Sequence, residues 1–426
     1  MIKQLFWEVL TGAILFLLLP FTGAAQTPDS TLVLDDLIRQ VRTQNPELQS
    51  SYEGWRASKT RIPQEKALPD PVLGLNLMNL PVNSFAFDQE PMTGKQISLM
   101  QLFPFPGKLD LKGKIAESES EITYLQYQEL QNQLIKKTRQ AYYDLFYIDQ
   151  AIATVTGNQE LLQEFVEIAE TRYSVGGGLQ QDVMRAQVAL SKMIDRELKL
   201  FQNRESMQAQ INALINEPAD APLGHPVVPE ASRQTAKLDS LIAQAERSSP
   251  LLAAWDTVVK RSGQQVDLAL RDRYPDFSAG VAYTQRDELQ NGMKGYDVVS
   301  AMFNIKIPLY HGKKQSQKVQ QQRINRSAME YRYRNVKNSV ARQLQQSLTN
   351  AEKNRRLVDL YETGIIPQAE ESLESSLAGY QNGKVDFLSL LDSELTLFQF
   401  RLDYHRFVAD YHKAIADLEA LTGTQF

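Results

Sequence analysis

The sequence contains no cysteine among its 426 residues. This absence excludes disulfide bonds, cysteine metal ligands, thiol nucleophiles and a lipid anchor on an N-terminal cysteine. There are only four histidines: His225, His311, His405 and His412. The last two are seven residues apart on one predicted helix, two turns, which is too far for one metal ion without further ligands. We therefore predict no metal centre and no cofactor.

Motifs for catalysis and for nucleic-acid binding are also missing. The sequence has no HExxH zinc motif, no GxSxG nucleophile motif and no phosphate-binding P-loop. Its 46 basic and 51 acidic residues give a net charge of −5, and no polybasic stretch marks a nucleic-acid partner. These absences predict a protein that is not an enzyme and that depends on a partner for energy.

Long apolar runs are scarce, and the one clear example lies near the N-terminus. Val9–Phe21 is apolar, follows Lys3 and precedes the small residues Thr22–Ala25. This pattern predicts a signal peptide over residues 1–25, with the mature chain starting near Gln26 outside the cytoplasm. No other run approaches about 18 apolar residues, so any further membrane crossing requires β-strands in a closed barrel.

The chain repeats itself at a spacing of 204 to 207 residues. The matched segments are Leu34–Ile38 with Leu238–Ile242, Asn45–Pro46 with Ser249–Pro250, Leu68–Asp70 with Tyr274–Asp276, Phe105–Lys108 with Tyr310–Lys313, and Tyr173–Gly176 with Tyr380–Gly383. Such ordered self-similarity indicates one supersecondary unit written twice. We predict a first repeat over residues 26–215, a proline-rich linker over 216–237 and a second repeat over 238–426.

Each repeat contains two stretches with the two-residue period of a β-strand. The predicted strands are residues 71–82, 95–103, 277–284 and 298–307, with exposed loops over 83–94 and 287–295. In the last strand Phe303 and Ile305 alternate with Asn304 and Lys306. Strands of this length and pattern suit a membrane barrel, with Phe303 and Ile305 facing lipid. The alternative is an ordinary soluble β-sandwich.

Very long helices follow the strands. The sequence predicts helices over residues 107–173, 180–215, 313–380 and 385–421; the first is about 100 Å long at about 1.5 Å per residue. Gly364 and Pro367 should interrupt the third helix, and Gly157 should allow a matching bend in the first. The last helix carries a coiled-coil-like stripe. Its members are Leu388, Leu391, Leu395, Phe398 and Leu402. Rods of this length must extend away from any compact body.

The strand count predicts an oligomer. Single-chain membrane barrels begin at about eight strands, and open strand edges in lipid leave backbone groups without hydrogen-bond partners. Four strands must therefore be completed by other copies, giving eight strands in a dimer or twelve in a trimer. The same symmetry would gather the long helices into a second, helical cylinder.

Several segments resemble the TolC outer-membrane efflux family over essentially the whole mature chain. The two hairpin-tip signatures are Arg172–Gly176 with Asp182–Val183 and Ala186–Gln187, and Tyr380–Phe387. Within the family, Ala67–Pro71, Phe103–Lys108 and Ile366–Glu370 resemble the branch of heavy-metal (cobalt–zinc–cadmium or copper–silver type) efflux pumps. The resemblance implies a mixed α+β membrane protein: a homotrimer with a 12-stranded outer-membrane β-barrel continued by a long α-helical periplasmic barrel.

The resemblance also implies site residues at the hairpin tips. Asp182 and Asp392 follow the turns where the family places acidic constriction residues, and rings of carboxylates favour cations in a narrow pore. Ser389 stands where relatives carry a second acid, which puts a double acidic ring in doubt. Tyr173 and Tyr380 could hold the mouth shut across neighbouring helices, or be ordinary core aromatics.

The turn residues are the remaining candidates. Gly176, Gly177, Gly178, Gly383 and Lys384 form the tips, which the family uses to dock an adaptor protein; the glycines also serve as plain helix ends. Asp386 lies here too and is a candidate helix cap.

The function implied is a passive exit duct of a tripartite efflux system. An inner-membrane pump and a periplasmic adaptor (membrane fusion protein) would be its partners, outer-membrane lipid its surroundings, and heavy-metal cations or drugs its substrates. The alternatives are the outer-membrane duct of type I protein secretion and a periplasmic coiled-coil structural or adaptor protein with a soluble β-domain.

Overall fold

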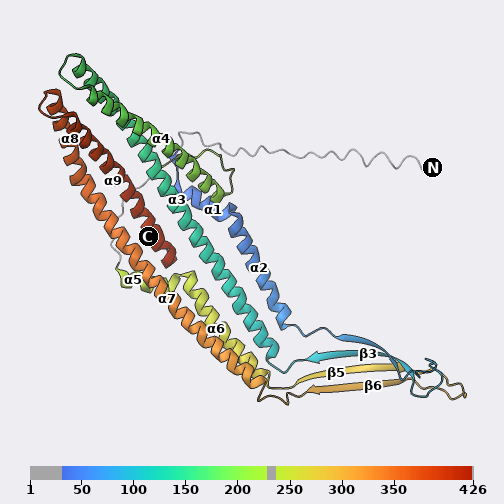
Figure 1. Cartoon of the computed structure of the whole chain (residues 1–426). Coiled ribbons are helices and arrows are strands. Elements are labelled where there is room, and N and C mark those ends of the chain that lie inside the picture. The colour runs from blue at the N-terminus through green and yellow to red at the C-terminus, as the bar shows by residue number, and fades with distance from the viewer. Residues whose placement is uncertain (1–30, 228–236, 425–426) are drawn as a thin grey trace, which may run out of the picture.

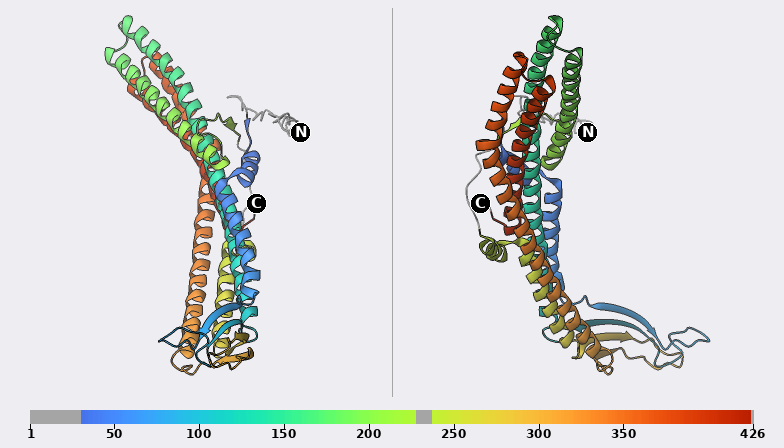
Figure 2. Two further views of the ribbon diagram at one scale, coloured as in Figure 1. Left: turned by 90° about the vertical axis from the view of Figure 1, so that its right-hand side faces the viewer. Right: turned by 60° about the vertical axis from the view of Figure 1, so that its left-hand side comes forward.

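The computed structural model describes residues 31–227 and 237–424, so the predicted signal peptide lies outside the described residues. A long shaft of helices joins a small sheet at an angle, and two helical hairpins end the shaft far from the sheet (Figures 1 and 2). In the part of the chain that is described, no helix combines the length and apolarity that crossing a membrane requires.

The sheet has four antiparallel strands in the order β2-β3-β5-β6. These are β2 (Val72–Met78), β3 (Gly94–Phe103), β5 (Asp276–Gln285) and β6 (Val298–Lys306). The first strand ends four residues before the predicted Val82 because Asn79 adopts a left-handed conformation, with φ of 51°, which turns the chain away from the sheet. A separate parallel pair joins β1 (Thr31–Leu32) to β4 (His225–Pro226).

The register gathers the large apolar side chains on one face of the sheet. Directly paired residues share a face, and Leu75 pairs with Ile97, Ile97 with Tyr283, and Tyr283 with Val299. The odd-numbered residues of all four strands therefore lie together. The large apolar members with exposed side chains are Leu73, Leu75, Leu77, Ile97, Leu99, Phe103, Val281, Tyr283, Val299, Phe303 and Ile305. The opposite face carries mostly small or polar residues, such as Gly74, Ser98, Ser278 and Ser300.

The helices repeat one order in the two halves. The first half has α1 (Leu34–Gln44), α2 (Pro46–Lys66), α3 (Lys108–Ser174) and α4 (Gln180–Ile215). The second half has α5 (Leu238–Ser248), α6 (Pro250–Arg271), α7 (Gln315–Leu360), η1 (Tyr361–Ile365), α8 (Ile366–Gln381) and α9 (Phe387–Thr422). Near the sheet, α2, α3, α6 and α7 form one layer in that order, as their mutual contacts show (Figure 1).

The predicted interruption of the long helix occurs in the second half alone. η1 is a single turn of π-helix, and Pro367 lies in the first turn of α8, where the N–H that proline lacks is not needed. By contrast, α3 continues as one helix through Gly157. The bend expected at Gly157 therefore does not break α3, because a glycine leaves the helical hydrogen bonds intact, and the bend itself stays a prediction.

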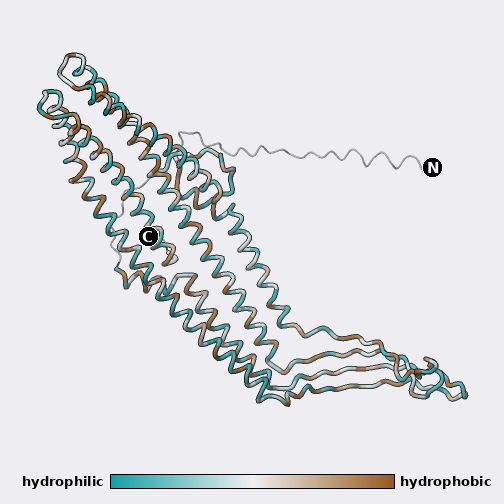
Figure 3. The backbone as a smooth tube through the Cα atoms, viewed as in Figure 1, coloured by the Kyte–Doolittle hydropathy of each residue, from teal (hydrophilic) through white to brown (hydrophobic). Residues whose placement is uncertain are grey.

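The cores lie between the helices. One apolar cluster fills the hairpins and includes Leu162, Phe165, Phe387 and Phe398, and a second surrounds Tyr142 near α1. Hydrophilic residues dominate the lower part of α7, as Figure 3 shows. The predicted stripe of α9 holds only in part, because Leu391, Phe398 and Leu402 are buried whereas Leu388 and Leu395 are exposed.

A buried lysine fastens the corner between sheet and shaft. Lys108 begins α3, and its Nζ lies 2.8 Å from Oδ1 of Asp276 and 3.5 Å from Oδ1 of Asp272. Lys318 also reaches Asp272, at 2.6 Å. The corner thereby joins the first half of the chain to the second, and Phe105 stacks on Tyr274 with ring centroids 4.5 Å apart beside it.

We expect Lys108→Met to destabilise the protein by about 1–3 kcal/mol, because Asp276 loses its cation in a partly buried place. Lys114→Met is the control, since Lys114 pairs with Asp110 on an exposed helix surface, where such pairs contribute little to stability. Thermal unfolding followed by helical circular dichroism measures both. Equal losses in the two variants would contradict a special role for the corner.

Candidate functional site

The two hairpin tips lie at the end of the shaft remote from the sheet (Figure 1). In the first tip the chain turns over residues 175–179, between α3 and α4; in the second it turns over residues 382–386, between α8 and α9. Gly176 and Gly383 have φ of 76° and 70°, a left-handed conformation that favours glycine. These tight reversals bring the ends of all four helices together.

A hollow of about 490 Å³ lies between the tips. Both hairpins line it, with residues Arg172, Gly176, Gly177, Gly178, Leu179, Gln181, Asp182, Arg185, Tyr380, Gly383, Val385, Asp386, Phe387 and Leu388. Most of the predicted tip residues are therefore brought together. Tyr173, Lys384 and Asp392 do not line the hollow; all three are exposed.

Arg172 connects the two tips. Its Nη2 donates a hydrogen bond of 3.0 Å to the carbonyl oxygen of Gly177 in its own turn. Its guanidinium lies over the ring of Tyr380, 4.6 Å from the centroid, and so reaches the other hairpin. One side chain thus closes its own turn and packs on the neighbouring hairpin, an attraction worth about 0.5–2 kcal/mol.

Tyr380 is buried and Tyr173 is exposed, so the two tyrosines differ in environment. Tyr380 is 3% exposed and packs edge-on against Phe387, with ring centroids 5.4 Å apart. Its hydroxyl has no hydrogen-bond partner among the described residues. Burial raises the pKa of the Tyr380 hydroxyl, and the charge of Asp182 raises it further. Tyr380 therefore stays neutral and carries an unused hydrogen-bonding group next to Asp182.

The acidic residues of the tips have separate surroundings. Asp182 is half-buried in the first turn of α4, whereas Asp392 lies exposed on α9. Asp386 caps α9, since its carboxylate accepts a 2.7 Å hydrogen bond from the backbone N–H of Ser389. This bond, together with the charge of Arg185, keeps the pKa of Asp386 below its ordinary value. The expectation that Asp386 caps its helix is confirmed.

Two functional candidates were missed by reasoning from the sequence. Arg172 and Arg185 both line the hollow beside Asp182. Arg172 belongs to the tip signature, but no local pattern reveals that its side chain reaches a tyrosine 208 positions later in the chain. The repeat gives no hint either, because the residue that matches Arg172 in the second tip is Gly379.

The histidines and acids do not assemble a metal centre in the described ranges, where no group of three or more potential ligands is placed to hold an ion. His225 bonds the Asp149 carboxylate at 2.7 Å, and His405 and His412 pack separately against Phe146 and Tyr143. The tip instead offers charged and polar groups around an opening between helices. Such an arrangement suits selection and gating of a passage.

Comparison with known proteins agrees with this geometry. The family model described as "Outer membrane efflux protein" matches residues 241–424. The cobalt-zinc-cadmium resistance protein CzcC of Cupriavidus metallidurans is 20% identical over 88% of this chain and 85% of its own length. The outer membrane protein TolC of Salmonella enteritidis is 21% identical over 86% of this chain and 76% of its own.

The fold has a close counterpart among solved structures. The outer membrane protein VceC from Vibrio cholerae has a TM-score of 0.79 at 17% identity, over 92% of this chain and 96% of that one. The long helical hairpins with a small sheet are thus a TolC-like fold. This chain is therefore similar to the outer membrane efflux proteins, through the family match over residues 241–424 and through the TolC-like fold of its described residues.

Proposed function

We propose that this protein is the exit duct of a tripartite efflux system, assembled as a homotrimer. The observation that carries the proposal is the four-stranded sheet, whose exposed apolar face sits on a helical shaft too long for a compact domain. An exposed apolar face of this extent needs lipid or protein to cover it. The opposite face carries small and polar residues. The sheet therefore suits the wall of a barrel, with its apolar face toward lipid and its polar face toward water inside.

The edges of the protomer support closure by other copies. β2 and β6 are the edges of the sheet, and α2 and α7 are the edges of the helix layer below. The β6–α7 edge of one copy can pair with the β2–α2 edge of the next. This head-to-tail contact, repeated from copy to copy, closes as a ring. Three copies give twelve strands, enough for a barrel, above a cylinder of twelve helices.

We expect the protein in mild detergent to have three times the mass of one mature protomer. The reason is that each unpaired strand edge in lipid costs several kcal/mol unless another copy covers it. Light scattering coupled to size exclusion, corrected for bound detergent, measures the mass. A stable monomer or dimer would contradict the trimer, and recovery from cells without detergent would favour the soluble adaptor alternative.

The tips are the proposed site of gating and of adaptor docking. Three copies would place Asp182 and Asp392 around one mouth, with Tyr173 and Tyr380 contacting neighbouring helices to hold it shut. The turn residues from Gly176 to Gly178, with Gly383 and Lys384, would meet the adaptor, which links the duct to an inner-membrane pump. The carboxylates would favour cations.

Heavy-metal cations are the proposed substrate class, since the relative CzcC is described by cobalt-zinc-cadmium resistance. We expect a deletion strain to become sensitive to these metals and to regain resistance with the restored gene. Growth across a metal series, beside a series of hydrophobic drugs, measures the preference. Sensitivity to the drugs alone would be consistent with an efflux duct but would contradict heavy-metal cations as its substrates.

A further inference from the structure

Two glutamates and one histidine are buried on one face of α9, where it packs against α3. Glu394, His412 and Glu419 are 1%, 9% and 8% exposed. Their spacings of 18 and 7 residues are about five and two helical turns, so all three point the same way. We call this contact the α3–α9 seam. It joins the first hairpin to the second, since α3 comes from one half of the chain and α9 from the other.

Glu394 lies in the apolar part of the seam without an ion-pair partner. Neither oxygen of its carboxyl group has a hydrogen-bond partner among the described residues, and Val155, Leu162, Leu390 and Phe398 belong to the cluster that surrounds it. Its polar neighbour on α3 is Asn158, which is itself buried and whose side chain only partly offsets the effect of burial on the carboxyl group. Burial therefore raises the pKa of Glu394 to about 7.

The charged groups near Glu394 are already engaged elsewhere. Arg401, on the same helix, bonds Glu370 of α8 at 2.7 Å, and its charge only partly offsets the effect of burial on Glu394. Arg196 of α4 lies over the ring of Phe398, 5.0 Å from its centroid. An ionised Glu394 would thus be a buried charge without an ion-pair partner, which is strongly unfavourable.

His412 is the opposite case further along the seam. Its ring stacks on Tyr143 of α3, with centroids 4.8 Å apart, and its Nε2 has no hydrogen-bond partner among the described residues. Burial lowers the pKa of His412 to about 4. The nearby cations do not change this: Lys413 bonds Asp144 of α3, and Arg355 of α7 lies toward Tyr411.

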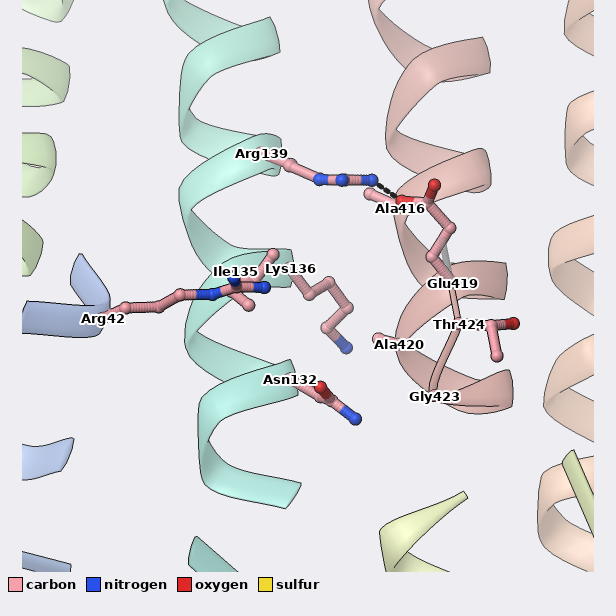
Figure 4. A pocket seen from close by; sticks show the side chains of 10 residues that line it. All are labelled: Arg42, Asn132, Ile135, Lys136, Arg139, Ala416, Glu419, Ala420, Gly423 and Thr424. Atoms are coloured by element: carbon pink, nitrogen blue, oxygen red, sulfur yellow. Dashed lines mark ion pairs between the residues drawn. The ribbon is translucent and has the colours of Figure 1, made fainter. Parts of the chain in front are cut away.

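Glu419, the third of these residues, differs from the other two because its charge is paired. Glu419 forms an ion pair with Arg139 of α3, and Figure 4 shows the two side chains meeting across a cavity of about 110 Å³. Arg42 and Lys136 also line this cavity. Charge is therefore compensated at this end of the seam, whereas Glu394 and His412 are accommodated only without charge.

We propose that the α3–α9 seam is a proton-linked clasp, which holds the two hairpins together while Glu394 is protonated and His412 is neutral. When the hairpins part, water reaches both groups, so Glu394 releases a proton and His412 takes one up. This linkage goes beyond the proposed function and does not depend on it, because it follows from burial within one chain.

The two groups respond to pH in opposite directions. Glu394 contributes fully to the stability of the closed seam below its ordinary pKa of 4.5, and this contribution is lost as pH rises to about 7. His412 contributes fully above its ordinary pKa of 6.5, and its contribution is lost as pH falls to about 4. Between those limits each changes the equilibrium for parting by up to about tenfold per pH unit. In the native protein the two slopes largely cancel.

The test is the thermal midpoint of helical circular dichroism between pH 4.5 and 7.5, measured on the full-length protein in detergent. Glu394→Gln should leave only the pH dependence that comes from His412, so the thermal midpoint should rise with pH. His412→Phe keeps the stacking on Tyr143 and should leave only the pH dependence that comes from Glu394, so the thermal midpoint should fall with pH. The double variant should be nearly flat, relative to the native protein.

Matched controls and a second variant guard against trivial outcomes. Glu374→Gln and His311→Phe change an exposed acid and an exposed histidine, and should leave the slope unchanged. If Glu394→Gln fails to assemble, Glu394→Leu should still give a midpoint that rises with pH. Single variants that run parallel to the native protein would overturn the clasp.

A distance measurement then follows the hairpins themselves. Because the chain has no cysteine, Met184→Cys on α4 and Leu388→Cys on α9 provide unique spin-label sites, both exposed. In the His412→Phe background the distance distribution should broaden as pH rises from 5 to 8; an unchanged distribution would contradict the clasp. If the pH slopes appear but the protein conducts nothing in bilayers, the duct proposal fails and the clasp stands.

Discussion

Phe303→Lys should sharply reduce the amount of assembled trimer in the outer membrane. Phe303 lies on the apolar face of the sheet near the middle of β6 and is 66% exposed in the protomer. A lysine on a lipid face costs up to about 2–4 kcal/mol at mid-bilayer, and each trimer would carry three of them. Heat-resistant trimer bands in outer-membrane fractions, compared at equal expression, measure the effect.

The neighbouring positions provide a graded control. Ile305 shares the face of Phe303 but lies at the end of β6, where the cost of a lysine falls to about 0–1 kcal/mol. Asn304 lies on the opposite face, so Asn304→Lys should be tolerated. The expected order of damage is therefore Phe303 first, Ile305 second and Asn304 last. Equal tolerance at Phe303 and Asn304 would mean that this face does not meet lipid.

Replacing both Asp182 and Asp392 with alanine should weaken the cation preference of the channel. In the proposed trimer these positions would supply six carboxylates near one mouth, which would attract cations and repel one another. We expect block by a multivalent cation added on the periplasmic side to weaken by about tenfold or more, or about 1.4 kcal/mol. Single-channel recording in planar bilayers measures both the selectivity and the block.

The single variants separate the two positions, because Asp182 lies in the hollow beside Tyr380 whereas Asp392 is exposed on α9. Asp195→Ala with Asp403→Ala is the matched control, since these acids lie on the same two helices but more than three turns from Asp182 and Asp392. A double tip variant that selects and blocks like the native channel would show that the constriction lies elsewhere.

The sequence by itself determined the local elements. Helix α4 spans the predicted residues, α3 ends one residue after the predicted Tyr173, and three of the four strands agree within a residue or two. These features depend on hydrophobic period, on the absence of proline and on glycine at the turns, all of which act over a few residues. The two-residue period also predicted that Phe303 and Ile305 share a face.

Only the tertiary structure decided which of these features meet. Helical period alone favours Leu388 and Leu395 for the buried face of α9, yet both are exposed and Glu394 is buried instead. The buried face of α9 is set by the helices packed around it, α3, α7 and α8, rather than by the spacing of its leucines. Likewise, Arg172 meets Tyr380 because two hairpins from different halves lie side by side. Burial of a charged group, and hence its pKa, depends on what the rest of the chain places around it.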